Sequence, residues 1–277
     1  MTWRPVGAVL PSELTEARLE LHFAAQIVSA PGTTWLPPKP DFSHSNLGWD
    51  DRLGLLASRR AGSASRRAAL VFESLEIAVL GGGTERASFQ LAGVTTSEAL
   101  SWLHDRMDPV ASALELPSHE MPSHPLADGV PFSEGGPAAR SELAAWFSNA
   151  SSVLRAAVAE QSGASLVRCW PHHFDVASLV TLDPHEDPEE ARSIGMGLSP
   201  GDDFYDEPYF YVNPWPRPSA DALPPMAGGG AHWHTEAWTG LVLTAGAILL
   251  EAPSRRSELV ARTLRDGLAA CHRLLSR

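Results

Sequence analysis

Cysteine is scarce in this chain: only Cys169 and Cys271 occur among 277 residues, and they form no metal-ligand spacing. The sequence therefore indicates neither a disulfide scaffold nor a cysteine-based zinc site. Long hydrophobic runs are missing as well. The longest apolar segment, Gly240 to Leu250, is far below the roughly 18 to 20 residues that a membrane-spanning helix needs. We expect it to be a buried strand, and we expect no contact with a membrane.

The N-terminal residues lack the basic stretch, apolar core and small-residue cleavage site of a secretory signal. Together with the scarcity of cysteine, this predicts a soluble, cytoplasmic protein. The sequence leaves the oligomeric state open.

Positive charge is also in short supply. The chain carries 21 Lys and Arg against 33 Asp and Glu, a net charge of −12, and its longest basic run, Arg59 to Arg67, is interrupted by Gly, Ser and Ala. Because a nucleic-acid groove needs clustered positive charge, we expect no nucleic-acid partner. The sequence also has no phosphate-binding loop, dinucleotide fingerprint or H-E-x-x-H helix, so nucleotide-dependent and zincin-type mechanisms lose support.

One segment matches the letters of a catalytic motif but lacks the features that the motif needs. Gly197-Leu198-Ser199-Pro200-Gly201 matches the G-x-S-x-G pattern of a nucleophile elbow, which needs a backbone N–H after the serine and a helix beyond it. Pro200 has no N–H, and the acidic residues that follow are a poor helix start. We therefore exclude a serine hydrolase at Ser199 and expect a turn at Pro200-Gly201.

Apolar residues at helical spacing predict four helices, over 12–30, 95–107, 137–161 and 254–276. Pro31-Gly32 is expected to end the first helix, and Thr95 with Glu98 forms a capping-box pattern at the start of the second. Between the helices lie runs typical of strands, over 52–58, 69–80, 86–91, 166–170, 176–182, 194–198, 209–213 and 239–250.

The order of these elements favours an α+β fold rather than strict βαβ alternation. We expect one globular unit over 1–277, with two similar-sized halves, 1–115 and 137–277, each with helices packed on a mainly antiparallel sheet. The proline- and glycine-rich segment 116–136 is the expected linker between the halves.

The first candidate for chemistry is His172-His173-Phe174-Asp175, which leads into a predicted strand. Side chains alternate faces on an extended backbone, so His173 and Asp175 are expected to project together. A carboxylate beside an imidazole can orient it, raise its basicity or share a metal with it, which makes the two a candidate catalytic pair. The alternative is a polar cluster that satisfies buried backbone groups at a bend.

The second candidate is His232-Trp233-His234-Thr235-Glu236. On an extended backbone His232, His234 and Glu236 share one face, which suits a metal site, with His173 and Asp175 as further ligands. A mixed imidazole and carboxylate set favours zinc, iron or manganese. The alternative is an exposed strand end with ordinary surface histidines.

The third candidate is an aromatic and acidic stretch. All three tyrosines, Tyr205, Tyr209 and Tyr211, fall within seven residues of one another, close to Trp215 and Asp202. Tyrosine offers an apolar ring with a polar tip, so Tyr205, Tyr209, Trp215 and Asp202 are the predicted ligand-binding residues of a small-molecule pocket. An edge strand that ends in Pro214-Trp215-Pro216 is the competing interpretation, and the two are compatible.

Three segments together resemble a bacterial family of unknown activity that carries W-P-x-H-F-D-x-A and S-P-G-D motifs. They are Leu21 to Val28, Trp170 to Ala177 and Ser199 to Asp202. The resemblance implies that these segments form one unit, and it implies no reaction. Members carry either H-F-D or S-F-D, so the resemblance gives no uniform metal role to His173.

The sequence thus predicts an enzyme that acts on a small molecule where the segments around His173 and His234 converge, with a divalent metal as an option. The alternative is a non-catalytic module that binds a small molecule or a partner through the aromatic cluster.

Overall fold

The computed structural model describes residues 3–183, 185, 190–225 and 228–276. The fold is α+β with two antiparallel sheets, as predicted. The chain divides into two compact units. One, the first-sheet unit, comprises residues 13–144 and 168–174, and the other, the second-sheet unit, comprises residues 1–12, 145–167 and 175–277. The segment 116–136 lies within the first-sheet unit, whereas the sequence had suggested a linker there.

The first-sheet unit contains a five-stranded sheet in simple sequential order. Helices α1 (Thr15–Trp35) and α2 (Thr96–Met107) pack against it, and the predicted capping box of Thr95 and Glu98 is present. Its strands are β1 (Gly48–Asp50), β2 (Leu55–Ala57), β3 (Arg67–Val71), β4 (Glu76–Leu80) and β5 (Arg86–Gln90), and β6 (Arg168–Trp170) contacts β1. The described residues also form short 3-10 helices, which are η1 (Pro11–Leu14), η2 (Pro125–Asp128) and η3 (Ala220–Ala222).

Two boundaries in this unit were predicted wrongly. Helix α1 continues through Pro31 to Trp35, because a proline loses one backbone bond but burial of the helix compensates for it. Gly32 does not end the helix. It allows the backbone at His44 to lie close to the helix, since a Cβ on Gly32 would lie 2.6 Å from the carbonyl oxygen of His44. The run 69–80 is two strands, β3 and β4, joined by a turn in which Leu75 has a φ of 49°.

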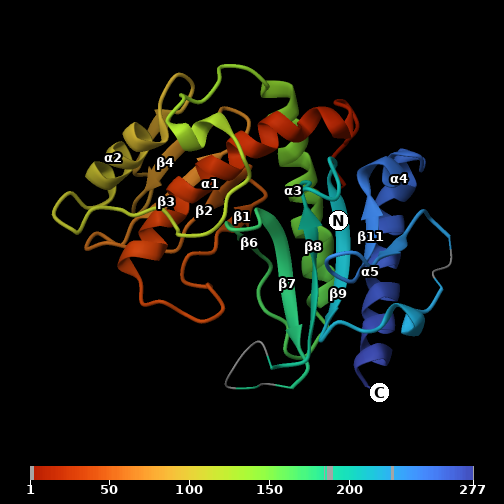
Figure 1. The fold of residues 1–277 in the computed structure, drawn as a ribbon. Coiled ribbons are helices and arrows are strands. Elements are labelled where there is room, and N and C mark those ends of the chain that lie inside the picture. The colour runs from red at the N-terminus through yellow and green to blue at the C-terminus, as the bar shows by residue number, and fades with distance from the viewer. Residues whose placement is uncertain (1–2, 184, 186–189, 226–227, 277) are drawn as a thin grey trace. The chain divides into compact units, whose positions relative to one another are not determined.

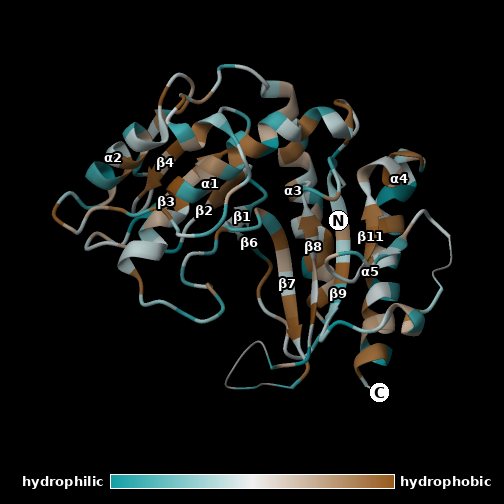
Figure 2. Ribbon diagram, in the orientation of Figure 1, coloured by the Kyte–Doolittle hydropathy of each residue, from teal (hydrophilic) through white to brown (hydrophobic). Residues whose placement is uncertain are grey.

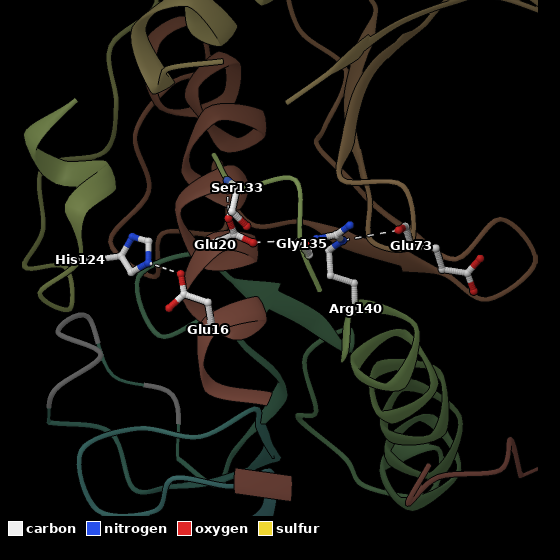
Figure 3. A network of polar contacts seen from close by, with 7 residues as sticks. All are labelled: Glu16, Glu20, Glu73, His124, Ser133, Gly135 and Arg140. Carbon is white, nitrogen blue, oxygen red and sulfur yellow. Dashed lines mark hydrogen bonds and ion pairs between the residues drawn. The ribbon is translucent and has the colours of Figure 1, made fainter. Parts of the chain in front are cut away.

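A buried ion pair fastens the start of α3 (Pro137–Val158) to α1 within this unit (Figure 3). Glu20 is 2% exposed and accepts a 2.7 Å hydrogen bond from the backbone N–H of Ser133. Its other oxygen lies 3.9 Å from Arg140, which also donates to the carbonyl of Gly135. Because both charges are buried, each depends on the other for stability.

The second-sheet unit contains β7 to β11, which pair antiparallel in the order β10-β11-β9-β8-β7 (Figure 1). Residues 145–158 of α3, with α4 and α5, complete the unit. The elements are β7 (Asp175–Thr181), β8 (Ser193–Ser199), β9 (Tyr209–Trp215), β10 (His232–His234), β11 (Gly240–Thr244), α4 (Ala245–Leu249) and α5 (Pro253–Leu275).

Helix α5 covers the apolar face of this sheet. It packs on β9, β8 and β11, and Gly267 brings the helix close, since a Cβ there would lie 2.9 Å from Val212 and 3.1 Å from Leu241. Apolar and polar residues alternate along α5, and β11 is largely apolar (Figure 2). The side chains that alternate with Val212 and Leu241 therefore belong to the opposite face of the sheet.

The segment 239–250 was predicted to be one buried strand, and this is wrong in its second half. Strand β11 ends at Thr244, whose side chain accepts a hydrogen bond from the backbone N–H of Ala247 and caps α4. Glu207 accepts another from the N–H of Gly246. A threonine followed by small residues is a helix-start signal that the apolar character of the segment concealed.

No helix in the described part of the chain is long and apolar enough to cross a membrane. The cytoplasmic location stays a prediction.

Candidate functional site

The candidate site lies on the face of the second sheet that α5 does not cover. Alternation along β9 places Tyr209, Tyr211 and Asn213 on this face. In the register of β8 their partners are Ser199, Gly197 and Gly195, respectively. Large polar side chains of one strand therefore face small residues of its neighbour.

The glycines of β8 make room for these side chains. A Cβ on Gly197 would lie 2.7 Å from the hydroxyl oxygen of Tyr211, which is closer than real contacts allow. A Cβ on Gly195 would overlap the side-chain oxygen of Asn213. Glycine inside a strand often marks such a close approach, and here it lets Tyr211 lie across the sheet.

Two carboxylates hold the tyrosines of β9. The hydroxyl of Tyr211 donates to Asp175, and that of Tyr209 donates to Asp202 at 2.5 Å. Asp202 also accepts hydrogen bonds from the backbone N–H groups of Phe204 and Tyr205 at 2.9 and 3.0 Å. Both oxygens of Asp202 thus accept hydrogen bonds within the chain and help to orient Tyr205 and Tyr209. Its binding of a ligand stays a prediction.

The hydroxyl of Tyr205 bridges the two histidines of β10. Its oxygen lies 3.0 Å from Nε2 of His232 and 3.1 Å from Nδ1 of His234. The i, i+2 spacing of the histidines therefore brings both imidazoles to one group. Because a tyrosine hydroxyl has one proton, it donates to one imidazole and accepts from the other.

His234 is enclosed by aromatic rings. It stacks on Trp238 with a centroid distance of 4.4 Å and meets the edge of Phe204 at 4.9 Å. The residue is 7% exposed, and its Nε2 is buried with no hydrogen-bond partner among the described residues. Burial lowers the pKa of His234, although Glu236 and Asp202 act in the opposite direction. A neutral imidazole with one nitrogen left for a ligand results.

The loop after β10 is fixed by Arg217. Its guanidinium donates to the hydroxyl of Thr239 at 2.8 Å, to the carbonyl of Ala237 at 3.0 Å and to the carbonyls of Thr235 and Glu236. A planar fork of donors can hold several carbonyls at once. Arg217 thereby sets the position of Trp238 against His234.

Burial keeps the tyrosines protonated. It raises the pKa of Tyr209 and of Tyr211 well above the ordinary value, and the carboxylates of Asp202 and Asp175 raise them further. Burial also raises the pKa of Tyr205, with Asp202 and Glu236 adding to the effect. All three hydroxyls are therefore donors at neutral pH, in surroundings of negative charge.

The structure does not place His173 on a strand beside Asp175. Residues 171–174 form a turn in which the N–H groups of His173 and Phe174 both bond the carbonyl of Trp170, and Phe174 has a φ of 55°. Strand β7 begins only at Asp175, so alternation does not relate the two side chains. The division between the units also falls between Phe174 and Asp175.

The predicted metal ligands do not form a metal centre. Among the described residues, no group of three or more His, Cys, Asp or Glu side chains is arranged to hold a metal ion. Strand β10 ends at His234, which leaves Glu236 exposed in the following loop. Trp215, predicted to line the pocket, is the last residue of β9 and is 43% exposed.

Sequence reasoning did not assign Tyr211, Trp238 or Arg217 to the site. Tyr211 had a usable signal, because it is two residues from Tyr209 on the same strand. Trp238 and Arg217 had none, since both reach the site from loops whose course depends on the folded chain.

Comparison with known proteins identifies no relative of this chain. No family model, no curated protein and no solved structure matches the chain. The resemblance of its W-P-H-H-F-D and S-P-G-D segments to a bacterial family stays a prediction.

Proposed function

We propose that the protein is an enzyme that acts on a small molecule at the face of the second sheet opposite α5, with His234 as the acid or base. One observation carries this proposal: Nε2 of His234 is buried and has no hydrogen-bond partner in the part of the chain that the structure describes, while Nδ1 lies 3.1 Å from the hydroxyl oxygen of Tyr205. An unpaired buried nitrogen costs stability. A substrate group that pairs with it would recover that cost.

The hydroxyl of Tyr205 links the imidazole of His234 to that of His232, which is exposed to solvent. When Nε2 of His234 gives its proton to a substrate, Nδ1 takes the proton of the Tyr205 hydroxyl. The phenol oxygen then takes the proton of Nε2 of His232, and His232 recovers one from water at Nδ1. The reverse order removes a proton from the substrate. Each group ends neutral, which suits the raised pKa of Tyr205.

The charges around the site favour a neutral or cationic substrate. Asp175, Asp202 and Glu236 all contribute negative potential at the tyrosines. Arg217, which lies nearby, donates to three backbone carbonyls and the Thr239 hydroxyl of the loop. An anionic substrate would meet repulsion at this face.

The test is conversion of metabolites in a mixed, small-molecule extract, followed by untargeted mass spectrometry. Wild-type protein should deplete at least one neutral or cationic compound and form a product. The His234→Asn variant should lose this conversion, because it retains the shape of the site and lacks the titrating nitrogen. No conversion by wild-type protein, or equal conversion by the variant, would overturn the proposal.

The Tyr205→Phe variant tests the relay separately. It keeps the ring and removes the hydroxyl, so we expect a slower reaction, with the loss mainly in kcat, and a changed tautomer of His234 by nitrogen NMR. The His104→Asn variant, on α2 of the first-sheet unit, is the matched control and should leave both unchanged.

A non-catalytic binding module is the second candidate, and the internal pairing of Asp175 and Asp202 with tyrosines favours it. Under that function, His234→Asn would weaken binding of a retained compound while no compound is converted.

A further inference from the structure

Aromatic rings gather around His234 on the face of the second sheet opposite α5. Trp238 lies at their centre. It stacks on His234 with a centroid distance of 4.4 Å, lies nearly parallel to Tyr209 at 6.2 Å and is nearly perpendicular to Tyr211 at 6.3 Å. Trp238 and Tyr211 are both partly exposed to solvent, so a ligand at this face can contact them.

Phe204 extends this group of rings toward solvent. The residue is 43% exposed, and its ring meets that of His234 at an interplanar angle of 71°. The face of an aromatic ring carries negative potential and attracts a positively charged group within about 6 Å of its centre. We define the ring group as Phe204, Tyr205, Tyr209, Tyr211 and Trp238. It suits an apolar or a cationic ligand and disfavours an anion.

Carboxylates beside the rings favour a cation over a neutral ligand. Asp175 and Asp202 each accept a hydrogen bond from a tyrosine of the ring group. Burial lowers the pKa of His234, but Glu236 and Asp202 act in the opposite direction and thus place negative potential at its ring. Because charges interact more strongly where water is partly excluded, a cation gains more at this face than a neutral molecule does.

Arg217 brings a positive charge near His234. Its guanidinium donates to the carbonyls of Thr235, Glu236 and Ala237 and to the hydroxyl of Thr239. These donors hold the loop in place, and the three carboxylates outweigh the one guanidinium. The net potential at the ring group is therefore negative.

The buried Nε2 of His234, which has no hydrogen-bond partner among the described residues, is open to a donor on such a cation. An ammonium N–H can donate to Nε2 when the proton of the neutral imidazole is on Nδ1. Nδ1 then donates to the oxygen of Tyr205, and the hydroxyl of Tyr205 donates to Nε2 of His232. In this arrangement every donor between the ligand and His232 meets an acceptor.

We propose that the substrate of this site is an organic amine in its protonated form, which contacts the ring group with its charge and donates an N–H to Nε2 of His234. The inference rests on the proposed function for the place of the site, and it narrows the substrate class from neutral or cationic compounds to amines. An ammonium group combines the positive charge that the rings and carboxylates favour with the donor that Nε2 needs.

The experiment is calorimetric titration of the full chain with butylamine, butan-1-ol and butyrate at neutral pH. The three probes have the same chain length and are a cation, a neutral molecule and an anion, respectively. We expect saturable binding of butylamine, and binding at least about tenfold weaker for the other two. Nitrogen NMR of the butylamine complex should show the proton of His234 on Nδ1, and a proton on Nε2 would overturn the proposed hydrogen bond.

Two substitutions remove rings. Trp238→Leu and Phe204→Leu should each weaken butylamine binding about threefold or more. Trp102→Leu is the control, because Trp102 is also partly exposed and stacks on Phe89 in the first-sheet unit. Circular dichroism establishes that each variant is folded, and the exposed Phe204 supplies the test if Trp238→Leu is not.

A third substitution removes charge. Glu236→Gln should weaken butylamine binding and reduce its dependence on salt. Glu258→Gln is the control, since Glu258 is an exposed carboxylate on α5.

Failure of this inference is distinguishable from failure of the proposed function. Equal binding of butylamine and butan-1-ol, or undiminished binding by both ring variants, would overturn the amine even if His234 is needed to convert another compound. Selective binding of butylamine that depends on the rings would support the amine even if the protein converts no compound.

Discussion

The hydroxyl oxygen of Tyr211 and the backbone of Gly197 lie so close that a single methyl group on the glycine would stand 2.7 Å from that oxygen. The two residues are paired across β8 and β9, and the same hydroxyl donates to Asp175. The hydrogen bond between Tyr211 and Asp175 on β7 thus depends on residue 197 of β8 having no side chain.

The Gly197→Ala substitution should therefore displace Tyr211 and break its bond to Asp175. We expect a loss of about 1–3 kcal/mol in the free energy of unfolding, the usual range for overpacking, measured by urea denaturation. Gly82→Ala is the control, because no atom lies within 4 Å of the added Cβ. Equal stability of the two variants would contradict the close contact.

Arg217→Lys should loosen the loop that carries Trp238. Lysine retains the charge but cannot donate to several carbonyls as a planar fork. We expect faster amide hydrogen exchange at residues 235–239, and a rise in the pKa of His234 as water reaches its ring. Arg265→Lys is the control, since Arg265 is exposed and pairs with the exposed Glu258. Unchanged exchange in Arg217→Lys would show that the loop holds its position without the guanidinium.

Acid should destabilise the protein through His22. The pKa of His22 is about 4 in the folded chain against 6.5 in the unfolded one, so the unfolded state binds more protons between these values. Stability is therefore fully present above pH 6.5 and is lost as the pH falls toward 4. A difference of this size corresponds to as much as about 3 kcal/mol.

The measurement is the free energy of unfolding at several pH values for the wild-type protein and for His22→Asn. The variant should be less stable at pH 7, because it lacks the bond to the carbonyl of Pro171, yet lose less stability on acidification. Parallel pH curves would show that His22 titrates alike in the folded and unfolded chains.

Glu20→Ala should be strongly destabilising, by about 3–5 kcal/mol, because it leaves the buried charge of Arg140 without its carboxylate partner. Glu258→Ala removes an exposed partner of Arg265 and should cost under about 1 kcal/mol. Thermal unfolding followed by circular dichroism compares them. A small effect of Glu20→Ala would mean that water reaches Arg140.

Alternation of side chains along strands predicted part of the candidate site from the sequence. It brought His232 and His234 together, while Tyr205 and Tyr209 were selected because the tyrosines cluster in the sequence. These residues are linked in the structure. The same rule failed at His173, because it holds only on an extended backbone and Phe174 adopts a positive φ.

The remaining features depend on contacts between distant segments. Proline marks a probable helix end, yet α1 passes through Pro31 because the surrounding helix is buried. His119 stands alone in a loop, and nothing in its local sequence indicates that it meets His172. Such pairings are set by the folded chain rather than by local spacing.

The first residues of the chain are bound by some of the last. Arg256 on α5 donates to the carbonyl of Val6 at 2.8 Å, and Asn149 on α3 pairs with both backbone groups of Arg4. During synthesis the segment around Val6 leaves the ribosome about 250 residues before its partner Arg256 on α5. The second-sheet unit can therefore complete its folding only after α5 has emerged, and the backbone around Val6 lacks this partner until then.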